Sequence, residues 1–126
     1  MNFDFSADQG LLRDELRKFF VHEVPLARSR TLMEQGGSHD AAAWVGLAGL
    51  GATALMLPEA CGGAGLGALE LCVLAEEAGR QLAPLPLAST MYLATQALLL
   101  GADESQQTRW LARIGHGEAA TLAAPL

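Results

Sequence analysis

Apolar side chains recur at helical spacing along most of this chain, and breaks in the pattern divide it into helix-sized segments. The first segment follows Ser6-Ala-Asp-Gln9, which has the form of a capping box. Its apolar positions lie one to four residues apart on one helical face: Leu12, Leu16, Phe19, Phe20 and Val24. This spacing predicts a first helix that ends at Pro25, because proline lacks the amide hydrogen that the helix needs. A shorter helix is predicted from Leu26 to Gln35, ended by Gly36-Gly37.

The stretch from Leu57 to Leu87 predicts a central helix around which the other segments are organised. Glycines at positions 62, 63, 65 and 67 lead into a helix that we expect over 68–82. Its main apolar stripe is Leu71, Leu74, Ala75, Ala78 and Leu82, widened by Leu69, Cys72 and Val73. A helix that is apolar on several faces must be covered by other segments.

A third helix is predicted over 41–51, before the glycines. Ser38 or Asp40 can cap it, and its buried side is expected to be Trp44, Leu47 and Ala48. Residues 52–57 are predicted to be an extended connector, because the residue before a proline is displaced from helical conformation and position 58 is proline.

Two more helices are predicted after the central one. The first follows the Ala83-Pro-Leu-Pro86 motif, covers 87–100 and is ended by Gly101. The second begins at a capping box formed by Asp103 and Gln106 and ends at Gly115. We expect its buried side to be Trp110, Leu111 and Ile114.

These elements predict an all-α fold, a bundle of five to six helices that occupies residues 1–118. The last eight residues, AATLAAPL, are apolar and uncharged. Such a segment has no obvious partner among the helices, so we interpret residues 119–126 as a linker or the first strand of another domain.

Composition agrees with a packed globular chain, since 51% of the 126 residues are apolar and 17% are charged. The formal net charge is −6 with no basic cluster, which argues against nucleic acid as a partner. Prolines and charges interrupt the apolar stretches before they could span a bilayer, so no membrane insertion is expected. The acidic start resembles no export signal. We therefore predict a cytoplasmic protein whose Cys61 and Cys72 are reduced.

Several short motifs could suggest a catalytic or cofactor-binding site within this chain, but each lacks the flanking residues or elements that such a site requires. Gly63-x-Gly65-x-x-Ala68 matches a relaxed dinucleotide fingerprint, but no strand adjoins the glycines and no second strand follows the helix. Glu76 and Glu77 point about 100° apart on a helix, so a solvated face or a structural ion pair is favoured over an acid–base couple. Ser89-Thr90 lacks the glycines of a nucleophile elbow. The histidines, at positions 22, 39 and 116, lack metal-ligand spacing. No catalytic residue and no metal ligand is predicted.

Several motifs in order resemble the N-terminal helical domain of the acyl-CoA dehydrogenases. They are Trp44 to Gly51, Leu57 to Gly67, Leu74 to Arg80, Ala83 to Leu87, and Trp110 to Glu118. The motifs stand in the family's order at compatible spacing, and the resemblance extends over practically all 126 residues.

The resemblance implies an enzyme that holds flavin adenine dinucleotide (FAD) and desaturates an acyl-CoA thioester between its α and β carbons. In the family a glutamate removes the α proton, while the β hydrogen passes to the flavin as hydride. That glutamate lies in a C-terminal helical bundle, and a middle β domain separates the bundle from the N-terminal helices. None of Glu59, Glu70, Glu76 or Glu77 corresponds to it. The chain alone should therefore be inactive and should not retain FAD.

The resemblance also implies a substrate-binding role for the helix after the Ala83–Leu87 motif. Alignment on Gly101 brings Leu85, Ala88, Met91 and Tyr92 to one wall of the acyl pocket, although the same residues could simply pack within the bundle. A fatty, a branched or a larger acyl group would suit such a wall. The implied partners are acyl-CoA and the middle and C-terminal domains or a partner subunit, in an oligomer.

Two functions remain open at this point. In the first, the chain is the N-terminal part of an acyl-CoA dehydrogenase and exposes apolar surface where the other domains dock. In the second, it is a free-standing helical interaction domain without chemistry, with its tail packed on its own helices.

Overall fold

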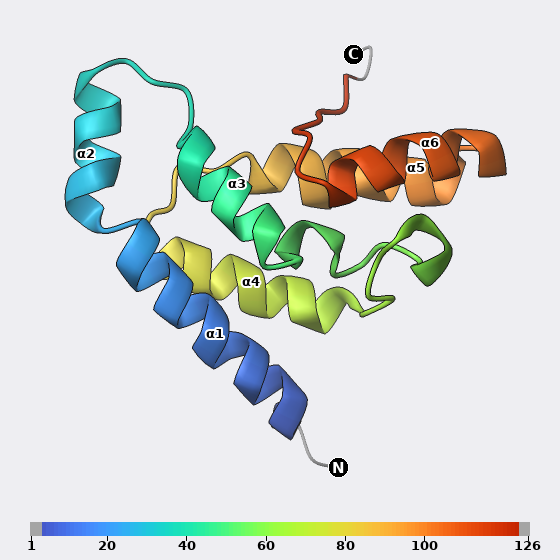
Figure 1. Ribbon diagram of the computed structural model, residues 1–126, viewed down its shortest axis with the longest axis horizontal. Helices are drawn as coiled ribbons and strands as arrows, with labels where there is room; N and C mark the ends of the chain where they lie inside the picture. Colours follow the sequence, from blue (N-terminus) through green and yellow to red (C-terminus); the bar gives the residue numbers. More distant parts are fainter. Residues whose placement is uncertain (1–3, 124–126) are drawn as a thin grey trace. The chain divides into compact units, whose positions relative to one another are not determined.

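The computed structural model describes residues 4–123 and confirms the all-α fold. No strand occurs within these residues (Figure 1). The α-helices are α1 (Ala7–Glu23), α2 (Leu26–Glu34), α3 (Ala41–Gly49), α4 (Ala68–Arg80), α5 (Thr95–Gly101) and α6 (Glu104–Gly115). Two short 3₁₀ helices, η1 (Ala52–Ala54) and η2 (Glu59–Cys61), follow α3, and a π-helix, η3 (Ala88–Ala94), leads into α5.

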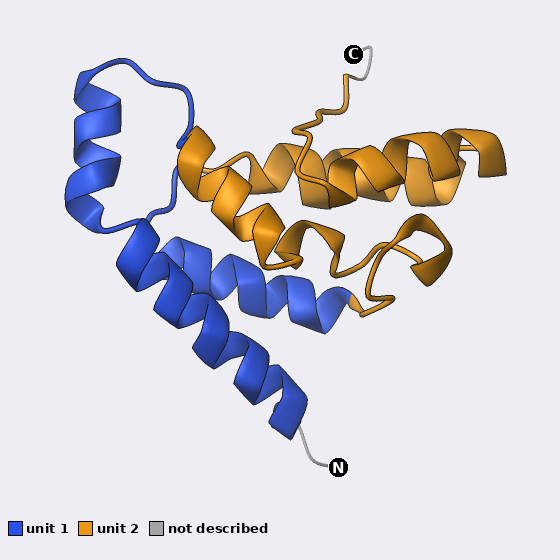
Figure 2. Ribbon diagram, viewed as in Figure 1, with its two compact units in different colours: residues 1–40, 68–84 blue, residues 41–67, 85–126 orange. Residues whose placement is uncertain are grey.

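The chain forms two compact units, each described by itself (Figure 2). The first contains residues 1–40 and 68–84, and therefore α1, α2 and α4. The second contains residues 41–67 and 85–126, and therefore α3, η1, η2, η3, α5 and α6.

In the first unit α1 packs against α4. The predicted capping box begins α1, since the Ser6 hydroxyl accepts from the Gln9 amide and the Gln9 side chain accepts from the Ser6 amide. Pro25 separates α1 from α2 as expected, because it stands as the N-cap of α2. The buried apolar side chains of this unit are Leu16, Phe20, Val24, Leu71, Val73, Leu74 and Ala78.

The predicted surface of the central helix is wrong on one face and at its end. Leu69 is 59% exposed and Cys72 is also exposed, whereas Glu77 is buried. The helix ends at Arg80 rather than Leu82. Leu82 adopts a left-handed φ of 49° in the turn that follows, where the Ala83 amide donates to the Ala78 carbonyl, and its side chain is 71% exposed.

In the second unit, side chains of α3 and η1 donate hydrogen bonds to the last residue of α6 and to the turn that follows it. The Trp44 Nε1 donates to the Gly117 carbonyl at 2.7 Å, and the Thr53 hydroxyl of η1 donates to the Gly115 carbonyl at 2.8 Å. Trp44 and Leu47 are buried as predicted. The second predicted capping box is also present, with Asp103 accepting from the Gln106 amide.

Two expectations for this unit are corrected. Residues 52–57 are not extended, because Gly51 reverses the chain at a φ of 77° and tight turns follow in which the Ala54 amide donates to Gly51 and the Leu57 amide to Ala54. The proline at position 58 restricts only its immediate predecessor. Trp110 is 39% exposed rather than buried, whereas Leu111 and Ile114 are buried as expected.

Candidate functional site

The helix after the Ala83–Leu87 motif begins as a π-helix before it continues as α5. Thr95 maintains this wider turn, because its backbone amide and its hydroxyl, at 2.8 Å, both donate to the carbonyl of Thr90 five residues earlier. Thr90 and Thr95 are both buried. π-turns of this kind occur often at functional sites, and neither the turn nor its threonines were singled out from the sequence.

The four predicted acyl-wall residues lie in or just before η3, at different depths. Ala88 is exposed, Leu85 and Tyr92 are half-buried, and Met91 is 2% exposed. Ala88 and Tyr92 stand about one turn apart, so they share one side of the helix, whereas Met91 belongs to the core. Their contact with an acyl group remains a prediction.

Thr90 also holds the segment that follows α6. Its hydroxyl donates to the Ala120 carbonyl at 3.1 Å and accepts from the Ala120 amide at 3.0 Å. The side chain of Thr90 is fully buried. The post-α6 segment, residues 119–123, therefore has one fixed point on the helices, which the sequence did not reveal.

A groove of about 480 Å³ lies between α5, α6 and the post-α6 segment. Small and apolar residues of α5 and its N-cap line it in an i, i+3, i+4, i+7 stripe: Ala94, Ala97, Leu98 and Gly101. Trp110 and Ile114 of α6 and residues 119–122 form the other walls. We call this the α5–α6 groove. None of the four predicted acyl-wall residues lines it.

The rim of the α5–α6 groove carries charge next to an aromatic ring. The guanidinium of Arg113 lies 4.8 Å from the Trp110 ring centroid and pairs with Glu118 at 2.7 Å. The hydrogen bond from Arg113 lowers the pKa of the Glu118 carboxyl. This side of the groove thus holds a neutralised ion pair, while its floor is apolar.

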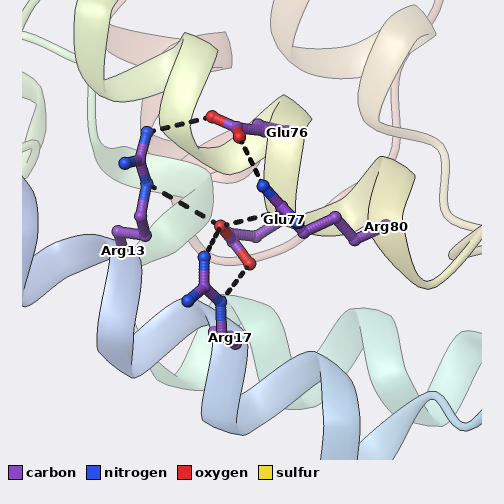
Figure 3. Close-up of polar contacts among 5 residues, drawn as sticks. All are labelled: Arg13, Arg17, Glu76, Glu77 and Arg80. Atoms are coloured by element: carbon purple, nitrogen blue, oxygen red, sulfur yellow. Dashed lines mark hydrogen bonds and ion pairs between the residues drawn. The ribbon is translucent and has the colours of Figure 1, made fainter.

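The Glu76-Glu77 pair belongs to a polar network in the first unit (Figure 3). Arg17 donates to both oxygens of Glu77 at 2.8 and 2.9 Å, and Arg13 and Arg80 lie at 3.8 and 3.5 Å from the same carboxylate. Glu76 lies outward and binds Arg13 at 2.9 Å and Arg80 at 2.8 Å. The hydrogen bond from Arg17 lowers the pKa of Glu77. A carboxylate held ionised in this way is a weak base, so the pair is a structural ion-pair network.

The glycine-rich loop does not offer its amides to a phosphate. The Ala64, Gly65 and Leu66 amides donate to the carbonyls of residues 54, 57 and 55, at 3.0, 2.9 and 2.8 Å. A Cβ on Gly63 would overlap the Leu57 carbonyl, which explains the glycine there. These three amides are therefore not free to bind a phosphate group.

Among residues 4–123, no three His, Cys, Asp or Glu side chains gather as metal ligands. Cys61 and Cys72 are free thiols. No helix in the described part of the chain has the length and hydrophobicity to cross a bilayer.

Comparisons with known proteins agree with this fold. Residues 6–118 match the family model described as "Acyl-CoA dehydrogenase, N-terminal domain". Acyl-CoA dehydrogenase FadE28 of Mycobacterium tuberculosis is 40% identical over 123 residues, which are 98% of this chain and 31% of FadE28. Acyl-CoA dehydrogenase IpdE2 of the same organism is 32% identical over 113 residues, 89% of this chain and 35% of IpdE2.

Solved structures of similar proteins superpose on most of the chain. One is a variant of the Tcur3481–Tcur3483 steroid ACAD, with 37% identity and a TM-score of 0.79 over 87% of this chain and 30% of that one. Another is the ChsE4–ChsE5 complex from Mycobacterium tuberculosis, with 25% identity and a TM-score of 0.84 over 93% of this chain and 32% of that one. The chain spans about a third of FadE28 and of IpdE2. These matches confirm the resemblance, and the chain belongs to the acyl-CoA dehydrogenase family, where it corresponds to the N-terminal domain.

Proposed function

We propose that this chain is the N-terminal part of an FAD-dependent acyl-CoA dehydrogenase that desaturates an acyl-CoA thioester between its α and β carbons. The match of residues 6–118 to the family's N-terminal domain carries this proposal. The 40% identity to FadE28 across 98% of the chain supports it. Because the chain spans about a third of that relative, the activity belongs to its assembly with further polypeptide.

The chain's own contribution is one wall of the acyl site. Exposure of Ala88 and partial exposure of Leu85 and Tyr92 suit direct contact with an acyl group. Met91 is buried, and its flexible side chain would support the wall from behind. Among fatty, branched and larger acyl groups, the 37% identity to a protein named a steroid ACAD favours a larger one.

The proton abstraction and the flavin are assigned to the remaining polypeptide. Glu77 is buried, ionised and held by arginines, and the amides of the glycine-rich loop are already bonded. FAD, when bound in the complete enzyme, accepts the hydride. This chain binds and orients the acyl group and contacts the other domains or a partner subunit in an oligomer.

A reconstitution experiment tests the proposal. The part of FadE28 outside the match is produced as a separate polypeptide and mixed with this chain, FAD and octanoyl-CoA or a steroid side-chain acyl-CoA. We expect the flavin absorbance of the mixture to bleach, while this chain alone retains no flavin and bleaches none.

The matched control replaces this chain with FadE28's own N-terminal third. Bleaching with the control but not with this chain would contradict the proposal and favour the free-standing interaction domain. Flavin retained by this chain alone would contradict both functions.

A further inference from the structure

The wide turn of η3 is not needed to give Thr95 a hydrogen-bond partner. In an uninterrupted α-helix its amide donates to the carbonyl four residues earlier, that of Met91, and a threonine hydroxyl can bond the same carbonyl. In η3 both groups donate instead to the carbonyl of Thr90, five residues earlier, with the hydroxyl at 2.8 Å. The extra residue in the turn therefore does not serve hydrogen bonding, and its effect lies in the side chains that precede it.

That extra residue changes the register of η3 relative to α5. Successive residues of an α-helix are about 100° apart around the axis, so one additional residue rotates everything before the turn by about this angle. With the wide turn Thr90 lies over Thr95, whereas in an α-turn Met91 would take this place. Every residue before the turn would then give its place to the next one, and Ser89 would stand where Ala88 stands.

The observed register gives the proposed acyl wall a small, apolar surface. Ala88 is exposed, while the hydroxyl of the neighbouring Ser89 donates to the Pro86 carbonyl at 3.2 Å. Met91 is 2% exposed and Tyr92 is half-buried. In the shifted register the Tyr92 phenol would enter the core in place of the Met91 thioether, and a hydroxyl would replace the Ala88 methyl at the wall.

Contacts on both sides hold the turn in the observed register. Before it, the Thr90 hydroxyl is bonded to the backbone of Ala120 at 3.0 and 3.1 Å, which opposes a rotation of this residue. After it, the Gln107 side chain of α6 donates to carbonyls at the end of α5 and its C-cap, those of residues 98, 99 and 102, at 3.2, 3.3 and 3.1 Å. The Thr95 hydroxyl closes the wide turn between these two held flanks.

We propose that Thr90 and Thr95 are positioning residues of the acyl site, which hold the register that presents Ala88 and Tyr92 to the acyl group. They do not touch the substrate themselves, because both are buried. The inference rests on the proposed function, which assigns the acyl wall to this helix. It adds a selectivity: a small apolar residue at the wall leaves room for a bulky group, so the register favours a ring-bearing acyl group over a slender chain.

The first test asks which carbonyl accepts the hydrogen of the residue-95 amide, and it needs neither flavin nor substrate. NMR couplings across hydrogen bonds join the amide at position 95 to the carbonyl at position 90 in the unaltered chain, if the inference holds. The double variant Thr90→Val/Thr95→Val keeps the side-chain shapes and removes both hydroxyls, and we expect its coupling to move to the carbonyl at position 91. Thr95→Val alone is the milder change, which should weaken the original coupling and which decides the question if the double variant does not fold. The exposed Thr108 of α6 supplies the control Thr108→Val, which should leave the coupling unchanged.

The second test measures acyl binding in the reconstituted enzyme. Each variant is mixed with FAD and the separately produced remainder of FadE28, and flavin bleaching is followed against the concentration of octanoyl-CoA or of a steroid side-chain acyl-CoA. We expect the double variant to raise the half-saturating concentration of the steroid acyl-CoA roughly tenfold, the scale of a misfit in an apolar pocket, and that of octanoyl-CoA much less. The bleaching rate at saturation should stay near that of the unaltered chain, because proton abstraction and the flavin belong to the remaining polypeptide. Thr90→Ser/Thr95→Ser keeps both hydroxyls and should behave like the unaltered chain.

Deletion of Leu93 separates the register from mere stability. Leu93 is 50% exposed and lies within the turn, so its removal leaves position 90 four residues before position 95. An α-turn then holds the observed register without either hydroxyl. Added to the double variant, this deletion should restore the low half-saturating concentration of the steroid acyl-CoA, which a purely stabilising role of the threonines does not predict.

Several results would overturn the inference. A coupling that still joins positions 95 and 90 in the double variant means that the hydroxyls do not hold the register. A moved coupling with unaltered half-saturating concentrations means that the register does not position the acyl wall, and equal losses for both acyl-CoAs contradict the selectivity. Deletion of Leu93 without restoration leaves the threonines a structural role only. Absence of bleaching with the unaltered chain contradicts the proposed function, whereas the NMR coupling tests the turn independently of it.

Discussion

The buried carboxylate of Glu77 offers a sharp test of how the first unit is held together. The substitution Glu77→Gln keeps the shape of the side chain but removes its charge. Arg17 then keeps a hydrogen bond only to the amide oxygen, because the new NH2 group cannot accept, and three guanidiniums lose the negative charge that they share. The control is Glu76→Gln on the same helix, where the side chain is 43% exposed and pairs with two of the same arginines.

The burial of Glu77 and of its arginine partner sets the expected loss of unfolding free energy. Removing one partner of a buried ion pair typically costs about 3–5 kcal/mol of unfolding free energy. Glu77 is 1% exposed, but the Arg17 side chain is 46% exposed and water can solvate it again, so we expect the lower end, about 3 kcal/mol. Because Glu76 is already solvated, its substitution should lower the urea midpoint much less. Urea unfolding at pH 7, followed by far-ultraviolet circular dichroism, measures both variants.

The same carboxylate predicts a dependence on pH. Its pKa in the folded chain lies below the ordinary value of 4.5, so its contribution is present above pH 4.5 and is lost as pH falls through the folded pKa. The unaltered chain should therefore lose stability below pH 4.5, and Glu77→Gln should lose less over the same window. Equal urea midpoints for the two glutamine variants at pH 7, or identical pH profiles for Glu77→Gln and the unaltered chain, would refute the reasoning.

Three further outcomes follow from local geometry. Gly63→Ala forces a Cβ into the Leu57 carbonyl and should lower stability by about 1–3 kcal/mol in thermal unfolding. Gly10→Ala, in open space inside α1, should instead raise stability by up to about 1 kcal/mol. A loss of stability in both variants would contradict the steric explanation. Trp44→Phe leaves the Gly117 carbonyl without its donor and should cost about 1–3 kcal/mol in urea unfolding, with an unchanged midpoint as the contrary result. Asp103→Ala removes the cap of α6 and should cost about 1 kcal/mol and speed amide exchange at Gln106; unaltered exchange there would count against the cap.

Local rules predicted the helix starts better than the helix surfaces. Both capping boxes and the break at Pro25 depend on residues close in the sequence, and all three are confirmed. Whether a helix face is buried depends on distant segments. Glu77 forms the structural ion pair that was one of its two expected roles, but it is buried under arginines of α1, and Leu69 is exposed; no spacing within α4 predicts either degree of burial.

The resemblance to the family predicted which helix carries the candidate site, but it did not predict the geometry of that helix. The motifs identified the family and placed Ala88 and Tyr92 on the helix after the Ala83–Leu87 motif. They could not predict the π-turn, because it depends on one backbone carbonyl, that of Thr90, accepting from both the amide and the hydroxyl of Thr95. A pair of threonines five residues apart inside an apolar helix is the signal that could have drawn attention to this turn.

The π-turn and the post-α6 segment are two consequences of the same residue. The carbonyl of Thr90 closes the wide turn, and its hydroxyl holds Ala120 in the extended conformation. The helix that carries the proposed acyl wall and the post-α6 segment are thus joined at one buried side chain. Any shift of η3 that preserves these bonds must move Ala120 with it, because both hydrogen bonds end on a single oxygen.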